Sequence, residues 1–173
     1  MFSRADIERL FGLLNEELRA QNITGELFLV GGAVMCLVYA VRPATRDVDA
    51  YFKPGRQIRE AAARVGQQTG LDNEWLNDAV KSYLSERGEF ASWLELDHLR
   101  VMVAQPEYLL AMKCLAMRIG EEFHDLDDVR YLLRHLNITA YRQALDIIGR
   151  YYPKDRFPQK TLYALEELLR QSQ

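Results

Sequence analysis

The segment from Leu27 to Tyr51, LFLVGGAVMCLVYAVRPATRDVDAY, limits the possible folds of this chain more than any other part of it. Glu26–Val30 is short, mostly apolar and β-prone, which predicts a buried strand. Gly31 and Gly32 follow at once, and the apolar run Ala33–Ala40 predicts a helix. The chain therefore passes from a strand into a helix through two glycines.

These two glycines form a candidate anion site. Glycine lets the backbone approach a ligand closely, and the start of a helix offers free N–H groups and a partial positive charge, which together favour a phosphate. A Gly-Gly pair at such a junction is also common where a helix packs tightly on a strand. Gly31 and Gly32 alone leave both interpretations open.

Two carboxylates lie on the next predicted strand, Asp47–Phe52. Because side chains alternate along a strand, we expect Asp47 and Asp49 on one face and Val48 on the other, toward the core. Two carboxylates about 7 Å apart repel each other unless a cation lies between them. Oxygen ligands of this kind suit Mg²⁺, which completes its coordination with water and substrate phosphates. For an Asp-x-Asp pattern alone, a solvated strand face is the alternative.

Hydroxyl and positively charged side chains stand just before the carboxylates. Thr45 and Arg46 directly precede Asp47, and Arg42 is close by. Guanidinium groups bind phosphate oxygens through paired hydrogen bonds. The glycine bend and the carboxylates fall on successive strands, so the combination predicts one site for a polyphosphate and Mg²⁺ at an end of a mixed sheet.

The remaining pattern predicts an α+β (mixed α/β) fold, with a mixed sheet flanked by helices and a helical C-terminal part. Ser3 can cap a first helix. Further helices are predicted over 56–66 and 73–84, and strands over 90–96 and 99–103. From residue 107 onward the pattern is helical, with a break at Gly120. We therefore expect a core over 1–105 and a helical C-terminal subdomain over 106–173, packed on the core.

The motif GGAVMCLVYAVRPATRDVD resembles the signature of the DNA-polymerase-β-type nucleotidyltransferase superfamily, in which a Gly-Gly or Gly-Ser turn and a helix precede Asp-x-Asp on the next strand. Three later segments resemble one branch, the small bacterial nucleotidyltransferases that include AbiEii-type abortive-infection toxins. These segments are WLNDAVKSYL (75–84), LRVMVAQPEYLLAMKCLAMR (99–118) and HDLDDVRYLL (124–133). The resemblance extends from Glu26 to Leu136.

This resemblance implies that Gly31 and Gly32 hold a nucleoside triphosphate (NTP), with Mg²⁺ (or Mn²⁺) bound by Asp47 and Asp49. Thr45 and Arg46 would contact the nucleotide, and Lys113 its phosphates. An acceptor hydroxyl would attack the α-phosphate and release pyrophosphate. The residues implied in orienting the acceptor or supporting the site are Asn77, Asp78, Arg118, Asp125 and Asp128.

Active superfamily members add a third carboxylate on a later strand, which binds a second metal ion and helps to deprotonate the nucleophile. Glu95 and Asp97 share a face of the predicted strand 90–96 and are both candidates. Neither stands in a clear motif. If neither reaches the metal, nucleotide binding could survive without efficient transfer.

Structural interpretations stand beside these roles. Lys113 lies in an apolar run and could be a salt-bridged lysine, and Arg118 could pair with Asp125 or Asp128. Asn77-Asp78 could hold a helix turn. The aromatic residues Tyr151, Tyr152 and Phe157 could stack on nucleic acid, but packing of the last helix explains them more simply.

Composition excludes several classes of protein. The chain has 173 residues, with 22 basic against 25 acidic ones and a net charge of −3, which argues against general nucleic-acid binding. No apolar run approaches the roughly 18 residues that span a bilayer, and the N-terminal residues do not resemble a signal peptide. Cys36 and Cys114 fit buried thiols better than a disulfide. We therefore expect a cytoplasmic protein with no membrane contact.

Three hypotheses follow. The first is a Mg²⁺-dependent nucleotidyltransferase that modifies a tRNA or protein hydroxyl; by the resemblance, it could belong to a toxin–antitoxin or phage-defence pair and have a cognate antitoxin. The second is a catalytically degenerate nucleotide- or protein-binding module of the same fold. The third, which is the least favoured, is an interaction protein whose Asp47/Asp49 pair is purely structural.

Overall fold

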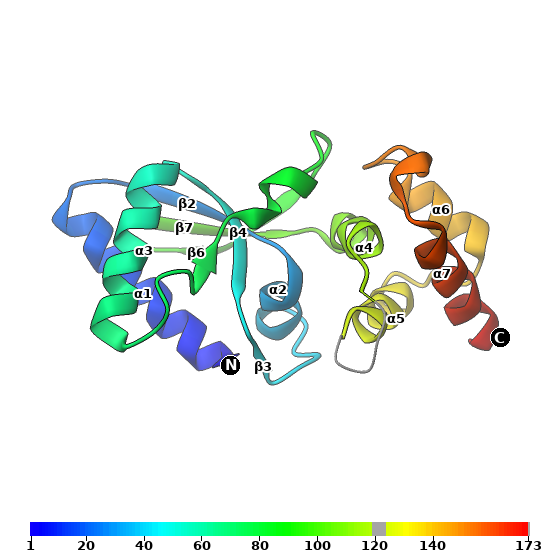
Figure 1. Cartoon of the computed structure of the whole chain (residues 1–173), viewed down its shortest axis with the longest axis horizontal. Coiled ribbons are helices and arrows are strands. Elements are labelled where there is room, and N and C mark those ends of the chain that lie inside the picture. Colours follow the sequence, from blue (N-terminus) through cyan, green and yellow to red (C-terminus); the bar gives the residue numbers. More distant parts are fainter. Residues whose placement is uncertain (119–123, 173) are drawn as a thin grey trace. The chain divides into compact units, whose positions relative to one another are not determined.

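A computed structural model of the chain describes residues 1–118 and 124–172 and shows the predicted α+β fold (Figure 1). The chain divides into two compact units: unit 1 comprises Met1–Ser82 and Phe90–Ala104, and unit 2 comprises Tyr83–Glu89 and Gln105–Gln173. The division after Ala104 falls one residue from the predicted boundary. The short segment Tyr83–Glu89 belongs to unit 2, whereas the sequence prediction assigned it to the core.

Unit 1 is built around a five-stranded mixed sheet with the strand order β5-β4-β2-β7-β6. Its elements are β1 (Phe2–Ser3), α1 (Arg4–Ala20), β2 (Gly25–Leu29), α2 (Gly31–Leu37), β3 (Ala44–Thr45), β4 (Val48–Lys53), α3 (Gly55–Thr69), β5 (Leu76–Asn77), the 3₁₀ helix η1 (Ala79–Tyr83), β6 (Phe90–Glu95) and β7 (Leu99–Ala104). Strand β2 is antiparallel to β4 and parallel to β7, so β2 occupies the centre of the sheet. The short strands β1 and β3 form a separate two-stranded sheet.

One face of the five-stranded sheet carries the core of unit 1. Along β4, Val48, Ala50 and Phe52 are buried, while the alternate residues are partly or fully exposed. The same alternation occurs in β2, where Leu27 and Leu29 are completely buried. Helices α1 and α3 lie side by side (Figure 1) and pack on β7 and β4, respectively. The opposite face therefore displays the alternate side chains of the strands.

Helix α1 begins where the sequence predicts, at a capping box. The Ser3 hydroxyl accepts a hydrogen bond from the Asp6 backbone N–H, and the Asp6 carboxylate accepts one from the Ser3 backbone N–H at 2.8 Å. These two bonds satisfy backbone donors that the helix itself leaves unpaired. One side of α1 belongs to the core, because Ile7, Phe11 and Leu14 are fully buried.

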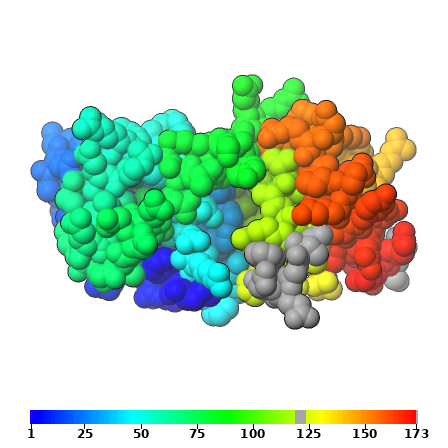
Figure 2. Space-filling model, viewed as in Figure 1, coloured from blue at the N-terminus to red at the C-terminus, as the bar shows by residue number. Residues whose placement is uncertain are grey.

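The predicted helix over 73–84 is wrong. This segment instead forms β5 and η1, since the backbone at its start pairs with β4: the Val48 N–H donates to the Trp75 carbonyl at 3.1 Å. The Trp75 indole is buried and donates from Nε1 to the Ala62 carbonyl at 2.9 Å. Tertiary pairing thus overrides the helical spacing of the apolar residues. In Figure 2, α3 and the segment that follows it form one continuous surface of unit 1, coloured teal to green.

Unit 2 is helical, as predicted for the C-terminal part. Its elements are α4 (Pro106–Leu115), α5 (Asp125–His135), α6 (Tyr141–Ile148), the 3₁₀ helix η2 (Lys154–Arg156) and α7 (Gln159–Gln171), which is red in Figures 1 and 2. Tyr108 is fully buried and stacks on Tyr151 with ring centroids 5.2 Å apart. Tyr152 and Phe157 are also buried, so these aromatic residues pack in the interior rather than presenting a stacking surface. The predicted break at Gly120 lies outside the described residues.

Both cysteines, Cys36 and Cys114, are buried free thiols, as the sequence predicted. None of the helices in the described ranges is both long and apolar enough to cross a membrane.

Two glycines provide a matched test of this packing. A methyl group on Gly88 would overlap the ring of buried Tyr108, whereas one on Gly12, in the middle of α1, meets nothing within 4 Å. We expect Gly88→Ala to lower the free energy of unfolding by about 1–3 kcal/mol, because the ring must move. Gly12→Ala should raise it by about 1 kcal/mol, since alanine favours the helix. Urea unfolding followed by circular dichroism measures both, and equal effects of the two substitutions would contradict this packing.

Candidate functional site

Gly31 marks the turn from β2 into α2. Its φ angle is +67°, in the left-handed region that other residues adopt at a cost of about 1–2 kcal/mol. Strand β4 lies directly beside this turn, since the Val30 N–H donates to the Asp49 carbonyl at 3.1 Å. A methyl group on Gly31 would lie 3.1 Å from Asp49 Oδ2. The absence of a side chain at Gly31 therefore lets the turn and the carboxylate lie in close contact.

Gly32 makes room for two further polar side chains. A methyl group at this position would lie 2.7 Å from Thr45 Oγ1 and 3.3 Å from Arg42 Nη1. Thr45 is buried, and its hydroxyl donates to the Asp47 carbonyl at 3.3 Å. The structure thus gathers both glycines, a hydroxyl and a guanidinium around one end of β4.

Helix α2, which follows the glycines, is shorter than predicted. It ends at Leu37, and Ala40 already has a left-handed φ angle of +52°. A helix of seven residues has a weak dipole. Any binding of an anion at this turn would therefore depend on Arg42 and on close approach to the backbone.

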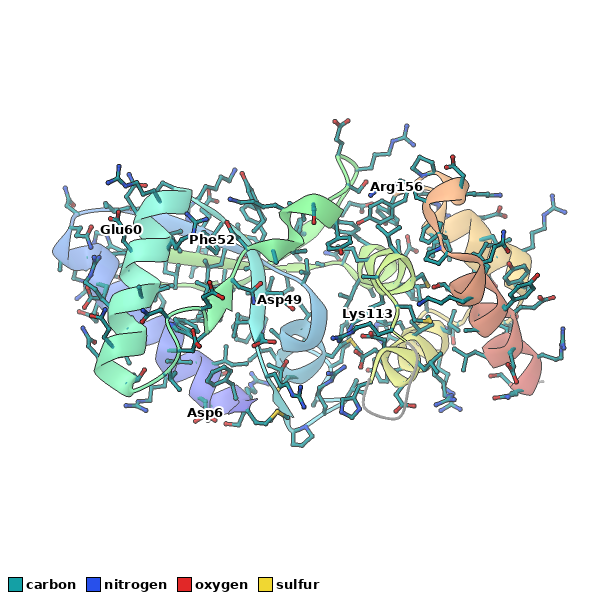
Figure 3. The ribbon with its side chains drawn as sticks, in the orientation of Figure 1. Asp6, Asp49, Phe52, Glu60, Lys113 and Arg156 are labelled. Carbon is teal, nitrogen blue, oxygen red and sulfur yellow. The ribbon has the colours of Figure 1, made fainter. Side chains whose placement is uncertain are left out.

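The two carboxylates of the Asp-x-Asp motif differ in their surroundings. Asp49 is partly buried in β4, and Figure 3 labels it where β4 passes α2. Asp47 and Arg46 are exposed and precede β4, which begins at Val48 rather than at Asp47 as predicted. Strand alternation therefore does not place the Asp47 carboxylate on the face of Asp49.

Asn77 is the polar neighbour of Asp49 in the sheet. It lies opposite Asp49 in the parallel register of β4 and β5, so the two side chains leave the same face of adjacent strands. The Asn77 side-chain oxygen accepts a hydrogen bond from the Ala79 backbone N–H at 3.3 Å. This bond orients the amide, because only the oxygen can accept and the Nδ2 group can only donate.

Asp78 has a structural partner set. Its carboxylate lies 2.6 Å from Lys81 Nζ and 2.6 Å from an Arg59 guanidinium nitrogen. The hydrogen bond from Lys81 lowers the pKa of Asp78 most, and Arg59 lowers it further, against a smaller rise from burial. Asp78 therefore ties β5 to α3 and η1, which fits a supporting role.

The structure places neither Glu95 nor Asp97 beside Asp49. In the strand register, Glu95 lies opposite Arg100, Arg100 lies opposite Glu26, and Glu26 lies opposite Lys53. Lys53 is four residues from Asp49, roughly 13 Å along β4, and Glu95 is three strands further across the sheet.

Asp97 is also at this far end of the sheet, where it forms an ion pair with Arg19 at 2.6 Å. The adjacent His98 carbonyl accepts a hydrogen bond from Gly25, the first residue of β2, at 2.9 Å. Neither Glu95 nor Asp97 therefore lies near Asp49, where the predicted third carboxylate would be needed. The hairpin between β6 and β7 carries them to the end of the sheet opposite the glycine turn.

The donors near the glycine turn still fit Mg²⁺ by their chemistry. Asp47 and Asp49 offer carboxylate oxygens, and Mg²⁺ is commonly held by one or two carboxylates with water and substrate phosphates. Across residues 1–118 and 124–172, no three His, Cys, Asp or Glu side chains gather in a way that could hold a metal ion by themselves. A Mg²⁺ ion held by Asp47 and Asp49 would complete its coordination with water and substrate oxygens.

Lys113 forms the centre of an ion cluster in unit 2 (Figure 3). Its ammonium lies 2.7 Å from Asp128 Oδ2 and 3.2 Å from Asp125 Oδ1, and Arg118 Nε donates to Asp125 Oδ2 at 3.0 Å. Lys113, Asp125 and Asp128 are all buried. Burial raises the pKa of Asp125, but Lys113 and Arg118 together outweigh it and hold that pKa below its ordinary value. This geometry fits the ion-pair interpretation that the sequence left open for Lys113 and Arg118.

Two aromatic residues near the site, Tyr51 and Phe28, were not predicted from the sequence as part of it. Tyr51 lies two residues beyond Asp49 on the same face of β4, and Phe28 of β2 lies opposite Tyr51. A signal was present, because Asp49, Tyr51 and Lys53 follow the period of two that separates the faces of a strand. Apart from Asp47 and Asp49, the sequence prediction used only the buried residues of these strands and therefore did not include Tyr51 or Phe28.

No family model, no curated protein and no solved structure matches this chain in the comparisons.

The Lys113 cluster makes a prediction about stability. Asp128→Leu leaves the buried ammonium with one carboxylate fewer, so the free energy of unfolding should fall by about 3–5 kcal/mol. The double variant Lys113→Met/Asp128→Leu removes both charges and should be less destabilised than the sum of its single variants. Urea unfolding of all three variants gives this coupling. Strictly additive losses would show that Lys113 and Asp128 do not form a stabilising pair.

Proposed function

We propose that this chain is a Mg²⁺-dependent nucleotidyltransferase that transfers a nucleotide from an NTP to a hydroxyl group of an RNA, such as a tRNA, or of a protein. The observation that supports it most is the contact between the Gly31 turn and the Asp49 carboxylate. A triphosphate site needs a backbone that phosphates can approach closely and a carboxylate suited to a divalent cation. The resemblance of the GG…DVD motif supports the same function.

Each residue of the site has a role in this proposal. The Gly31–Gly32 backbone would lie against the phosphates, and Arg42 and Thr45 would contact phosphate oxygens. Asp47 and Asp49 would hold Mg²⁺, which, when bound, neutralises charge that develops on the phosphates. Asn77 Nδ2 would donate to an oxygen of the substrate beside Asp49.

The reaction would be an in-line displacement at the α-phosphorus. The acceptor oxygen forms a bond to the α-phosphorus, and the bond from that phosphorus to the oxygen bridging the α- and β-phosphates breaks. Pyrophosphate leaves, and the proton of the acceptor hydroxyl passes to water. The chain contributes mainly by orientation and charge, as is typical of phosphoryl transfer.

A second candidate function is a nucleotide- or protein-binding module of the same fold that performs no transfer. The position next to Asp49 favours it, because an amide, Asn77, stands in register there and Glu95 and Asp97 lie at the far end of the sheet. A site without a third carboxylate lacks a ready base for the acceptor hydroxyl.

The biological role follows from the resemblance alone. An enzyme of this branch would act as the toxin of a toxin–antitoxin pair or as a phage-defence component, and a cognate antitoxin would neutralise it.

The chain offers matched carboxylate variants for a binding test. Asp49→Asn removes a charge beside the glycine turn, and Asp97→Asn removes one at the far end of the sheet. We expect wild type and Asp97→Asn to bind NTP with Mg²⁺ equally in calorimetry. Asp49→Asn should bind at least tenfold more weakly, because a charge-assisted contact is worth about 1.5–3 kcal/mol. Loss of binding in Asp97→Asn but not in Asp49→Asn would contradict the site.

Transfer separates the enzyme from the module. The wild-type protein is incubated with each NTP labelled at the α-phosphate, Mg²⁺, total RNA and total protein. Label on an acceptor that disappears with Asp49→Asn supports the enzyme, and we expect a loss of about 10²–10³ in rate. Binding of NTP with no label on any acceptor supports the module instead.

A further inference from the structure

The face of the sheet opposite α1 and α3 carries a row of aromatic and apolar side chains, which we call the aromatic row: Tyr51, Phe28, Met102 and Phe90. Phe28 is the centre, with its ring centroid 5.8 Å from that of Tyr51 and 5.1 Å from that of Phe90. Met102 pairs with Phe28 from β7. All four side chains are only partly buried.

The aromatic row begins next to the proposed phosphate site. Asp49 and Tyr51 leave the same face of β4, two residues and roughly 7 Å apart. In a nucleotide the ribose separates the α-phosphate from the base by a similar length. A nucleotide with its phosphates at Gly31 and Asp49 and its sugar along β4 therefore has its base over Tyr51 and Phe28.

The next row along the sheet is charged. Lys53, Glu26, Arg100 and Glu95 are cross-strand neighbours there, and Lys53 Nζ lies 5.2 Å from the centre of the Phe28 ring. These groups limit the aromatic surface at its far end. A single row of side chains, that of Tyr51 and Phe28, lies between the rows of Asp49 and Lys53, which matches one base rather than a long polynucleotide.

We infer that Tyr51 and Phe28 bind the base of the nucleotide by stacking. This inference rests on the proposed function, because it needs the phosphates at Asp49. Aromatic rings attract every base through its π face, and such stacking discriminates weakly between bases. The side chains of Phe28, Met102 and Phe90 offer no strong hydrogen-bonding group to read a base edge, and Tyr51 offers a single hydroxyl. The site therefore accepts purine and pyrimidine NTPs with affinities of the same order.

Cross-strand aromatic pairs also stabilise sheets without any ligand. The two roles make different predictions, since a purely structural pair affects stability and leaves the selection between ligands unchanged. Inorganic triphosphate serves as the discriminating probe, because it has the phosphates of an NTP and no base.

The experiment compares the binding of ATP, GTP, CTP, UTP and inorganic triphosphate, each with Mg²⁺, by calorimetry. The variants are Tyr51→Ala, Tyr51→Leu, Tyr51→Phe and Asp49→Asn. The control is Tyr163→Ala, which removes a tyrosine that is 69% exposed on α7. Circular dichroism verifies the fold of each variant, and Tyr51→Leu keeps apolar volume in the sheet if Tyr51→Ala does not fold.

We expect Tyr51→Ala and Tyr51→Leu to weaken all four NTPs roughly 5- to 150-fold, the range that one stacked base contributes. Triphosphate binding should stay unchanged, and Tyr51→Phe and Tyr163→Ala should behave as wild type. Asp49→Asn should weaken NTPs and triphosphate alike. A fluorescent 2-aminopurine nucleoside triphosphate should be quenched by wild type and Tyr51→Phe and not by Tyr51→Leu.

Two results overturn the inference in distinguishable ways. If Tyr51→Leu binds NTPs as tightly as wild type while Asp49→Asn weakens them, the base lies elsewhere and the phosphate site stands. If wild type binds neither NTPs nor triphosphate, the proposed function fails and the base site fails with it.

Discussion

The contact between the Gly31 turn and the Asp49 carboxylate is the constraint on which the rest of the site depends. It exists because β2 and β4 are adjacent and antiparallel, so the end of β2 and the start of β4 meet at one end of the sheet. A side chain at Gly31 would be strained by the positive φ angle and would press on the carboxylate. Gly32 extends the arrangement by admitting Thr45 and Arg42. Local backbone geometry thus brings a carboxylate, a hydroxyl and a guanidinium close to the two glycines.

The two faces of the five-stranded sheet carry different kinds of side chains. Val48, Ala50 and Phe52 of β4 are buried beneath the helices, and the residues between them remain accessible. Strand alternation therefore lets one short sequence supply both core side chains and side chains on the opposite face of the sheet. Unit 2 has its own stabilising centre in the Lys113 cluster and the aromatic packing around Tyr108. These contacts are internal to unit 2.

The sequence predicted the α+β class, the strand before Gly31 and the helix capped by Ser3, because those signals are local: apolar periodicity, glycine and a capping residue. It did not predict β5, because a strand of two residues is defined by pairing with β4 and has no pattern of its own. It also proposed Glu95 and Asp97 for the site. A strand pattern indicates on which face of the sheet a side chain lies, but not at which end of the sheet. For Glu95 and Asp97 the end is set by the antiparallel turn between β6 and β7. Asn77 lies beside Asp49 because β5 pairs with β4, which is a long-range contact.

Paramagnetic NMR with Mn²⁺ in place of Mg²⁺ tests the central claim most directly. Mn²⁺ broadens amide signals steeply with decreasing distance, so it locates the bound ion on the ¹⁵N-labelled protein in the presence of a non-hydrolysable NTP. The account predicts that the amides of Gly31, Gly32 and Asp49 broaden first, while those of Asp97 and His98 at the far end of the sheet stay sharp. Broadening centred on Asp97 and His98, or none at Gly31 with nucleotide present, would contradict it.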